Sequence, residues 1–299
     1  MAAIWEDPLL EKDTYQEQIY KVQDYIEKHL DMVLNVELLS KVAGFSHFHF
    51  QRIFSLITGE PLYAFIKRIR LEKAAYMLLT DENRSITDIA LSVGFSNQSS
   101  FAKAFKSRFK MSSSAYRKSK TDYNKSAFVV DYYEGMDMRI EPLSVEIRQE
   151  EDLQLVYVRY SGPYKGDSDL FSELFDSLYQ WATERELITE SSRWFVIYHD
   201  HGDETDEDML RISVCLSVNR NVAVSGKVGV MTLCHGKFGV GKFYIGAKDY
   251  GKAWYHMYAV WLQKSGYTAA DRCAFEHYPA QDELSDKQLV EICIPLIET

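Results

Sequence analysis

The chain has 299 residues and a mass of 34.7 kDa, with 46% hydrophobic, 14% aromatic and 26% charged residues. This is about twice the usual domain length, so the sequence predicts two folded domains and excludes a disordered or collagen-like chain. No apolar run reaches the roughly 18 residues that a membrane-spanning helix needs, and the N-terminus lacks the pattern of a secretory signal. We therefore expect a cytoplasmic protein with no membrane partner.

The charged residues are distributed unevenly along the chain. Residues 1–32 carry 3 basic and 8 acidic side chains, residues 33–125 carry 15 and 7, and residues 126–299 carry 16 and 29. The middle segment therefore has a net charge of +8 inside a protein whose net charge is -10. Such clustering favours a polyanionic partner such as nucleic acid, whereas a solvated surface of mixed charge does not require it. The composition shifts again near residues 119–140, where we place the domain boundary.

The basic segment contains two copies of a helix, a tight turn and a second helix. In the first copy, Asn35 is the predicted cap of a helix that Gly44 ends, and Ser46 begins the next helix. In the second copy, Ser85 begins the helix that Gly94 ends, and the turn repeats the Gly-Phe-Ser sequence of the first. A single helix-turn-helix pattern is a weak signal, but two in one basic block strongly indicate DNA binding.

Two further helices complete the predicted N-terminal domain. Apolar residues at helical spacing predict a packing helix over residues 14–30. A long helix that starts after Pro61 connects the two units and fixes their separation. Two units in one chain can then enter successive major-groove segments about 34 Å apart without a dimer.

A helix in the major groove reads bases with short polar side chains, while flanking Lys and Arg meet phosphates. The helical period leaves Phe48, Gln51 and Arg52 on the outer side of the first unit's second helix. In the second unit, the apolar stripe is Phe101, Phe105 and Phe109. The outward residues are Gln98, Ser99, Ala102, Lys103 and Lys106.

Residues 14–120, which include LLSKVAGFSHFHFQRIFSLITGEPLYAFIKRIR and ITDIALSVGFSNQSSFAKAFKSRFKMSSSAYRK, closely resemble the DNA-binding domain of the AraC/XylS transcription regulators. The resemblance implies double-stranded promoter DNA as a partner, with RNA polymerase a further candidate. It assigns base reading to Phe48, Gln51, Arg52, Gln98, Ser99, Ser100, Ala102 and Lys103. At the positions of Lys110 and Ser114 the family usually has Gly and Pro, so the last loop is expected to differ in shape from that of the family. Lys103 replaces a frequent Arg and should read bases less strictly.

The acidic segment has the pattern of a duplicated α/β domain. Strand, helix and strand patterns follow one another from Ser144, and the second half repeats the same order. Gly162-Pro163-Tyr164 after the first strand is matched with Gly236-Lys237-Phe238 in the second half. Two similar halves related by a pseudo-two-fold axis predict a central cleft for a small molecule.

Glu276 is the polar residue of greatest interest in this segment. Strand alternation places it on the same face as Tyr278, and the simplest interpretation is a solvent-facing glutamate. Among aromatic rings, however, a carboxylate would attract a cation. Residues 144–297, including VYVRYSGPY and CAFEHYPA, resemble the GyrI-like effector-binding domain, in which the matching glutamate faces the ligand. The expected ligand contacts are Glu276, Tyr164, Trp194, Tyr198, Phe238, Trp254 and Tyr278.

Other chemistry is poorly supported. The glycine-rich Gly236–Lys242 approaches a phosphate-loop spacing, but Phe243 follows where Ser or Thr would hold magnesium. The acidic run Asp200–Asp208 lacks a calcium-loop pattern and is expected to be a solvated hairpin tip. We predict no metal, no cofactor and no catalytic residue, hence no enzyme; the alternative is a small-molecule hydrolase with Glu276 as general base.

The predicted fold is therefore multidomain, α and α+β. Residues 8–120 form an all-α double helix-turn-helix domain, and residues 121–139 form a linker. Residues 140–299 form a duplicated, GyrI-like α+β domain with an antiparallel sheet and a central ligand cleft.

Overall fold

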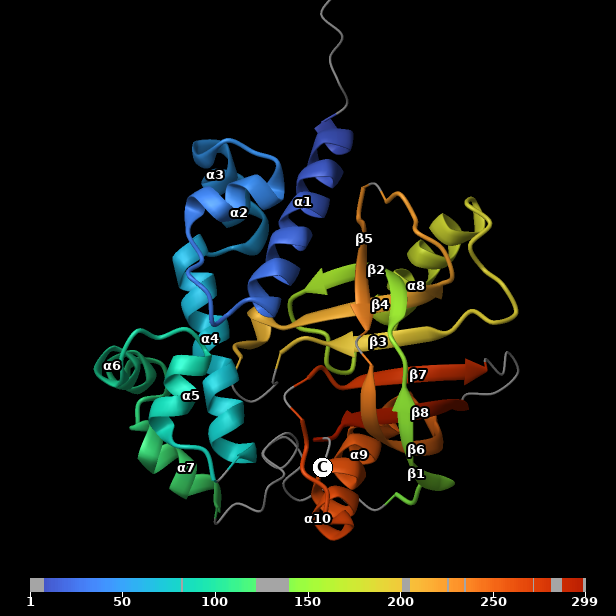
Figure 1. The fold of residues 1–299 in the computed structure, drawn as a ribbon. Coiled ribbons are helices and arrows are strands. Elements are labelled where there is room, and N and C mark those ends of the chain that lie inside the picture. Colours follow the sequence, from blue (N-terminus) through green and yellow to red (C-terminus); the bar gives the residue numbers. More distant parts are fainter. Residues whose placement is uncertain are drawn as a thin grey trace, which may run out of the picture.

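A computed structural model describes residues 8–81, 83–121, 140–200, 205–224, 226–233, 235–270, 272–280 and 287–297 (Figure 1). The predicted linker therefore falls outside the described residues from 122 to 139. The helices are α1 (Pro8–Lys28), α2 (Val36–Ala43), α3 (His47–Thr58), α4 (Leu62–Thr80), α5 (Ile86–Ser92), α6 (Gln98–Phe109), α7 (Ser113–Thr121), α8 (Ser168–Thr183), α9 (Tyr250–Tyr255) and α10 (Leu262–Ser265). The strands are β1 (Ser144–Glu150), β2 (Leu153–Ser161), β3 (Trp194–Tyr198), β4 (Arg211–Val218), β5 (Val228–Leu233), β6 (Gly236–Gly246), β7 (Phe275–Ala280) and β8 (Lys287–Pro295).

The N-terminal helices form two small cores that share α4. The first core joins α1, α2 and α3 to the first half of α4, and the second joins the rest of α4 to α5, α6 and α7. With 19 residues, α4 is about 28 Å long. The long connecting helix is thus confirmed, and its length suits two units that follow one groove. The helix predicted over residues 14–30 runs from Pro8 to Lys28.

The predicted caps explain where the short helices begin and end. The Asn35 side chain accepts a hydrogen bond from the backbone N–H of Leu38, and Gly44 adopts the left-handed conformation that ends α2. Ser85 caps α5 in the same way through Asp88. Ser46 is extended at the start of α3, but its side chain makes no capping hydrogen bond.

The C-terminal domain is built on one eight-stranded sheet with the order β1-β6-β8-β7-β3-β4-β2-β5. Every pairing between the described strands is antiparallel. The order is symmetric about the β7–β3 pair, so β2, β3 and β4 correspond to β6, β7 and β8. The outermost strands are exchanged, because β1 pairs with β6 of the second half and β5 pairs with β2 of the first. The predicted duplication is confirmed.

One part of the predicted duplication is wrong. Gly236 was expected to begin a loop equivalent to that of Gly162, but it is the first residue of strand β6. Glycine is rare in strands, and here it is required because a Cβ at Gly239 would overlap the Trp261 ring and one at Gly241 would overlap Met257. The correct equivalent of the Gly162 turn is therefore the end of β6.

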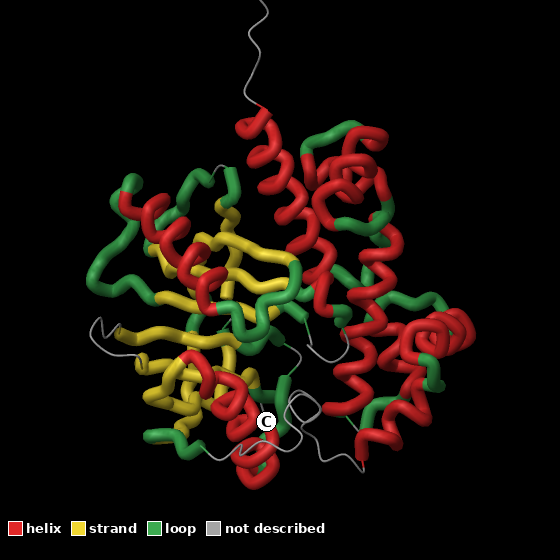
Figure 2. The backbone as a smooth tube through the Cα atoms, turned by 180° about the vertical axis from the view of Figure 1, so that it is seen from behind, coloured by secondary structure: helices red, strands yellow, loops and turns green. Residues whose placement is uncertain are grey.

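The two faces of the sheet have different neighbours (Figure 2). Helices α8, α9 and α10 cover one face, with a π-helical stretch over His256–Trp261 between α9 and α10. On the other face, Tyr20 of α1 packs with Tyr157 and the apolar residues of the central strands. The sheet thus lies between its own helices and the N-terminal domain. No helix in the described parts of the chain has the length and apolar character needed to cross a membrane.

The two turn glycines provide a stability test. Both have positive φ, but a Cβ at Gly44 would meet open space, whereas one at Gly94 would lie 2.5 Å from Arg70 and closer still to the Leu30 carbonyl oxygen. We expect Gly44→Ala to lower the free energy of unfolding by about 1–2 kcal/mol. Gly94→Ala should lower it by about 1–3 kcal/mol more, because overpacking is added. Urea unfolding of both variants measures this, and equal losses would contradict the packing at Gly94.

Candidate DNA-binding surface and effector site

The two recognition helices lie along the side of the molecule that is remote from the sheet (Figures 1 and 2). On α3, Phe48, Gln51 and Arg52 are exposed, and Phe48 retains 90% of its accessible surface. An apolar ring held in water at the start of a recognition helix is suited to contact a thymine methyl group. The opposite side of α3 is buried through Phe50, Ile53 and Phe54.

Helix α6 exposes the second set of predicted DNA-contacting residues and buries its opposite side, as α3 does. All of the residues predicted for it are exposed, namely Gln98, Ser99, Ser100, Ala102, Lys103 and Lys106. The Asn97 side chain caps the helix by accepting from the Ser100 N–H, while Phe101 and Phe105 are buried beneath. No predicted base-reading residue is covered by the C-terminal domain. Lys110, at the position where the family usually has glycine, is left-handed with φ of 59°.

Some cations of the basic segment serve the fold and not the outer surface. Arg70 donates to the carbonyl oxygens of Leu30 and Met32, and so attaches α4 to the turn that follows α1. Arg68 is buried and pairs with Glu60 at 2.7 Å and Glu72 at 3.0 Å. Net charge therefore overstates the number of arginines that can reach a phosphate.

In the C-terminal domain, Glu276 lies on the face of the sheet that the helices cover, and it is 1% exposed. The Trp254 indole donates to one carboxylate oxygen at 2.7 Å, and the Tyr278 hydroxyl donates to the other at 2.7 Å. The interpretation of Glu276 as a solvent-facing residue is therefore wrong. Burial raises the pKa of Glu276, and the hydrogen bonds from Tyr278, Trp254 and Tyr198 lower it, which leaves the pKa at about 6. These partners are neutral, so among the described residues the hydrogen bonds to this carboxylate bring no positive charge to balance it when it ionises.

Aromatic rings surround this carboxylate. Tyr198 contacts Trp254 edge-on at 5.5 Å between ring centroids and Tyr164 at 5.7 Å. Trp194 is the cross-strand partner of Tyr278, and Phe175 of α8 contacts both rings. The structure thus brings together five of the six predicted aromatic residues. Four of these five, and also Tyr250 of α9, either bond Glu276 or lie close enough to be affected by its charge; we call Tyr164, Tyr198, Tyr250, Trp254 and Tyr278 the aromatic cluster.

Phe238 is not part of this cluster, and Tyr250 was missed. Phe238 packs against Phe275, whose side chain is on the opposite face of the sheet from Glu276. Both errors follow from the misplaced glycine loop, which paired Phe238 with Tyr164. With β6 recognised as a strand, Tyr250 follows it as Tyr164 follows β2, and burial beside Glu276 raises the pKa of Tyr250 above its usual range. Because β6 contains four glycines, its sequence did not show the pattern of a strand.

The expectation of a solvated tip for the acidic run is also wrong in part. Asp200 is 6% exposed and pairs with Arg211 at 2.5 Å. Asp206 is exposed and pairs with Arg108 of α6 at 2.9 Å. Residues 201–204 lie outside the described residues. The run therefore contributes to the contact between the two domains.

Comparison with known proteins finds matches for both domains of the chain. A GyrI-like small molecule binding domain matches residues 143–297, and a helix-turn-helix domain matches residues 39–119. Regulatory protein SoxS of Salmonella typhimurium strain LT2 is 35% identical over 104 residues, which are 35% of this chain and 96% of SoxS. The chain belongs to the AraC/XylS family of transcription regulators.

Longer relatives share the DNA-binding part. Transcriptional regulator Rob of the same organism is 39% identical over 95 residues, which are 32% of each chain. The solved EcmrR–DNA complex has 16% identity and a TM-score of 0.46, and the match covers 88% of this chain and 99% of that one. The SoxS match and the two domain matches show that the chain is a DNA-binding regulator of the AraC/XylS type that carries a GyrI-like small molecule binding domain.

The pKa of Glu276 predicts a pH dependence of stability. A pKa raised from 4.5 to about 6 means that the folded state binds the proton more tightly. The resulting stability is present at low pH and is lost as the pH rises through 6. The difference in unfolding free energy between wild type and Glu276→Gln should therefore fall by about 1 kcal/mol from pH 5 to pH 8.

Glu291→Gln is the matched control for this measurement. Burial raises the pKa of Glu291, but hydrogen bonds from His277 and Arg148 outweigh burial and hold it at about 2. The contribution of Glu291 to stability is lost only as the pH falls. The difference in unfolding free energy between wild type and Glu291→Gln should therefore not decrease between pH 5 and pH 8. An equal decrease for both variants would contradict the assignment to Glu276.

Proposed function

We propose that this regulator reads promoter DNA with α3 and α6 and responds to an aromatic cation bound at Glu276. The observation that carries the effector class is a buried carboxylate whose hydrogen-bond partners are neutral and whose walls are aromatic. A cation there gains Coulomb attraction and cation–π contact, the latter about 0.5–2 kcal/mol. RNA polymerase is a candidate partner at the promoter.

The effector must separate rings that are packed together in this structure. Tyr278 and Trp254 each hold one carboxylate oxygen, so an entering cation would replace at least one of these hydrogen bonds. The same occupancy makes Glu276 a poor general base, because water would have to compete for the same oxygens. The hydrolase alternative is therefore less well supported. Chromatography of candidate compounds after incubation with the protein tests it, since turnover would favour an enzyme.

The DNA-binding function is tested by selecting duplexes from a random library with the full-length protein and then footprinting the protein on the selected duplexes. We expect two protected major-groove segments about one helical turn apart on the same side of the duplex. Selection of no preferred sequence, or a footprint of one segment only, would contradict readout by both helices.

Arg52 and Lys106 should differ in how their loss affects binding. Arg52→Ala should weaken the free energy of DNA binding by about 1–3 kcal/mol and relax the sequence preference at one position, because the Arg52 guanidinium group is expected to contact a base. Lys106→Ala should weaken binding to all sequences alike and reduce the slope of log Kd against log salt concentration by about one, because Lys106 is expected to contact a phosphate. Titrations of matched and mismatched duplexes at several salt concentrations measure both. A uniform loss with Arg52→Ala would reassign that residue to the backbone.

Glu276→Gln should weaken the binding of cations more than the binding of neutral molecules of similar shape. Tetraphenylphosphonium and neutral triphenylphosphine oxide are suitable probes, with quenching of tryptophan fluorescence as the measurement. We expect the cation to lose about tenfold in affinity, about 1.4 kcal/mol, while the neutral probe changes little. The same loss for both probes would show that charge does not select the effector.

A further inference from the structure

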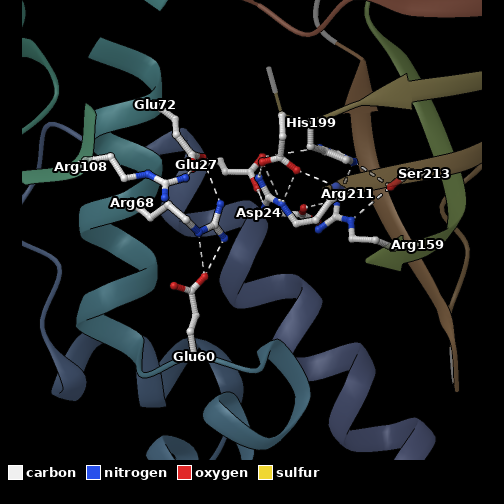
Figure 3. A network of polar contacts seen from close by, with 11 residues as sticks. Asp24, Glu27, Glu60, Arg68, Glu72, Arg108, Arg159, His199, Arg211 and Ser213 are labelled. Carbon is white, nitrogen blue, oxygen red and sulfur yellow. Dashed lines mark hydrogen bonds and ion pairs between the residues drawn. The ribbon is translucent and has the colours of Figure 1, made fainter. Parts of the chain in front are cut away.

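The two domains meet through buried ion pairs between α1 and the sheet (Figure 3). Asp24 of α1 accepts from Arg159 at 2.7 Å and from the Tyr157 hydroxyl at 2.8 Å. Glu27, one turn later, pairs with Arg211. Burial alone would raise the pKa of Glu27, but Arg211, with His199 and Arg159, holds it well below its usual range. Glu27 is therefore ionised, and α1 is fixed to the effector domain by charge.

His199 lies inside this contact with one ring nitrogen unsatisfied. Its Nε2 lies 2.8 Å from the Ser213 hydroxyl and accepts from Arg159 at 3.2 Å, so the proton is on Nδ1. Nδ1 is 3.6 Å from Glu27, and this buried atom makes no hydrogen bond. A shift of a few tenths of an ångström towards α1 would form that hydrogen bond, and a shift away would weaken the attraction.

Strand β3 connects this contact to the effector site. Tyr198 is the last residue of β3 and faces the aromatic cluster. His199 follows it, continues the extended pairing by donating its N–H to the Arg211 carbonyl oxygen, and faces α1. Tyr198 contacts the ring of Trp254, which donates to Glu276. Two consecutive residues therefore face Glu276 on one side of the sheet and Glu27 on the other.

The contact between the domains also has room for movement. A cavity of about 300 Å³ lies between α1, α4 and the sheet, and both Tyr198 and His199 line it. In a close-packed interface the end of β3 would be held on all sides, whereas a cavity leaves it space to shift.

A second set of polar contacts runs from α4 towards α3 and α6 (Figure 3). Glu72 of α4 pairs with Arg108 of α6 at 3.1 Å and with Arg68 at 3.0 Å. Arg68 in turn pairs with Glu60, which follows the end of α3. Because Arg70 of α4 donates to the carbonyl oxygens of Leu30 and Met32 just after α1, a displacement of α1 reaches α4 and the elements that orient α3 and α6.

We propose that the end of strand β3 couples the effector site to the DNA-binding domain, with Tyr198 responding to an occupant at Glu276 and His199 transmitting the shift to Glu27 of α1. This coupling rests on the proposed function, because it assumes an effector at Glu276. His199 acts as a positioning residue that contacts neither effector nor DNA.

The coupling is measured as the ratio of Kd values for a selected duplex with and without saturating tetraphenylphosphonium. In wild type we expect a ratio in the usual range of about 5- to 150-fold in either direction. His199→Gln should reduce it to less than about 2-fold, because the glutamine amide replaces Nε2 and leaves no equivalent of Nδ1. His199→Asn, whose amide replaces Nδ1, should retain part of the ratio.

His277→Gln is the matched control. His277 is also buried on the α1-facing side of the sheet, but it bonds Glu291 at 2.9 Å and belongs to a cluster away from α1. Its coupling ratio should equal that of wild type. Glu27→Gln provides a second test from the α1 side. A ratio in His199→Gln equal to wild type, or an equal loss in His277→Gln, would overturn the proposal.

Failure of the proposed function gives a different result. If tetraphenylphosphonium does not quench tryptophan fluorescence, the effector class is wrong, and coupling is then tested without a ligand. The Kd for DNA is compared among wild type, Glu276→Gln, His199→Gln and the double variant. Effects that depart from multiplicativity by more than about 2-fold support coupling through β3, and multiplicative effects overturn it.

Discussion

The arrangement of the whole molecule depends on two carboxylates of α1 that meet two arginines of the sheet. Asp24 and Glu27 are one turn apart, so both point to the same side of the helix, and Arg159 and Arg211 are almost fully buried. Removing charges from water is costly, and such pairs add little net stability compared with apolar residues. They do penalise any other register strongly, because a shift would leave a buried charge unpaired. They therefore set how α1 lies on the sheet.

This placement leaves the opposite side of the N-terminal domain free. The recognition helices are exposed at the far edge, so the effector domain does not cover the base-reading residues. Under the proposed function, an effector would therefore act by changing the relative orientation of α3 and α6 and not by uncovering them. Helix α4, which belongs to both small cores, is the element that sets this orientation.

Local signals in the sequence predicted most of the DNA-binding domain. Caps at Asn35 and Ser85 and glycines at the turns act within a few residues, so they can be read without tertiary information. In the C-terminal domain the duplication was predicted, but strand β6 was not, because its glycines are explained only by Trp261 and Met257 packed above them. Tyr250 and Phe238 were misjudged for the same reason. The contacts between domains, such as Glu27 with Arg211, join residues 184 positions apart and have no local signature.

The exchanged edge strands have a consequence for the effector domain as a whole. The β2–β4 half takes its outer strand from the segment that precedes β6, and the β6–β8 half takes its outer strand from the segment that precedes β2. The half that contains β2, β3, β4 and β5 is one contiguous stretch of chain, whereas the half that contains β6, β7 and β8 takes its outer strand β1 from the other end of the domain. The first strand of each repeat, β1 or β5, nevertheless pairs with the other repeat, so the monomeric domain has the architecture of a strand-swapped dimer joined into one chain.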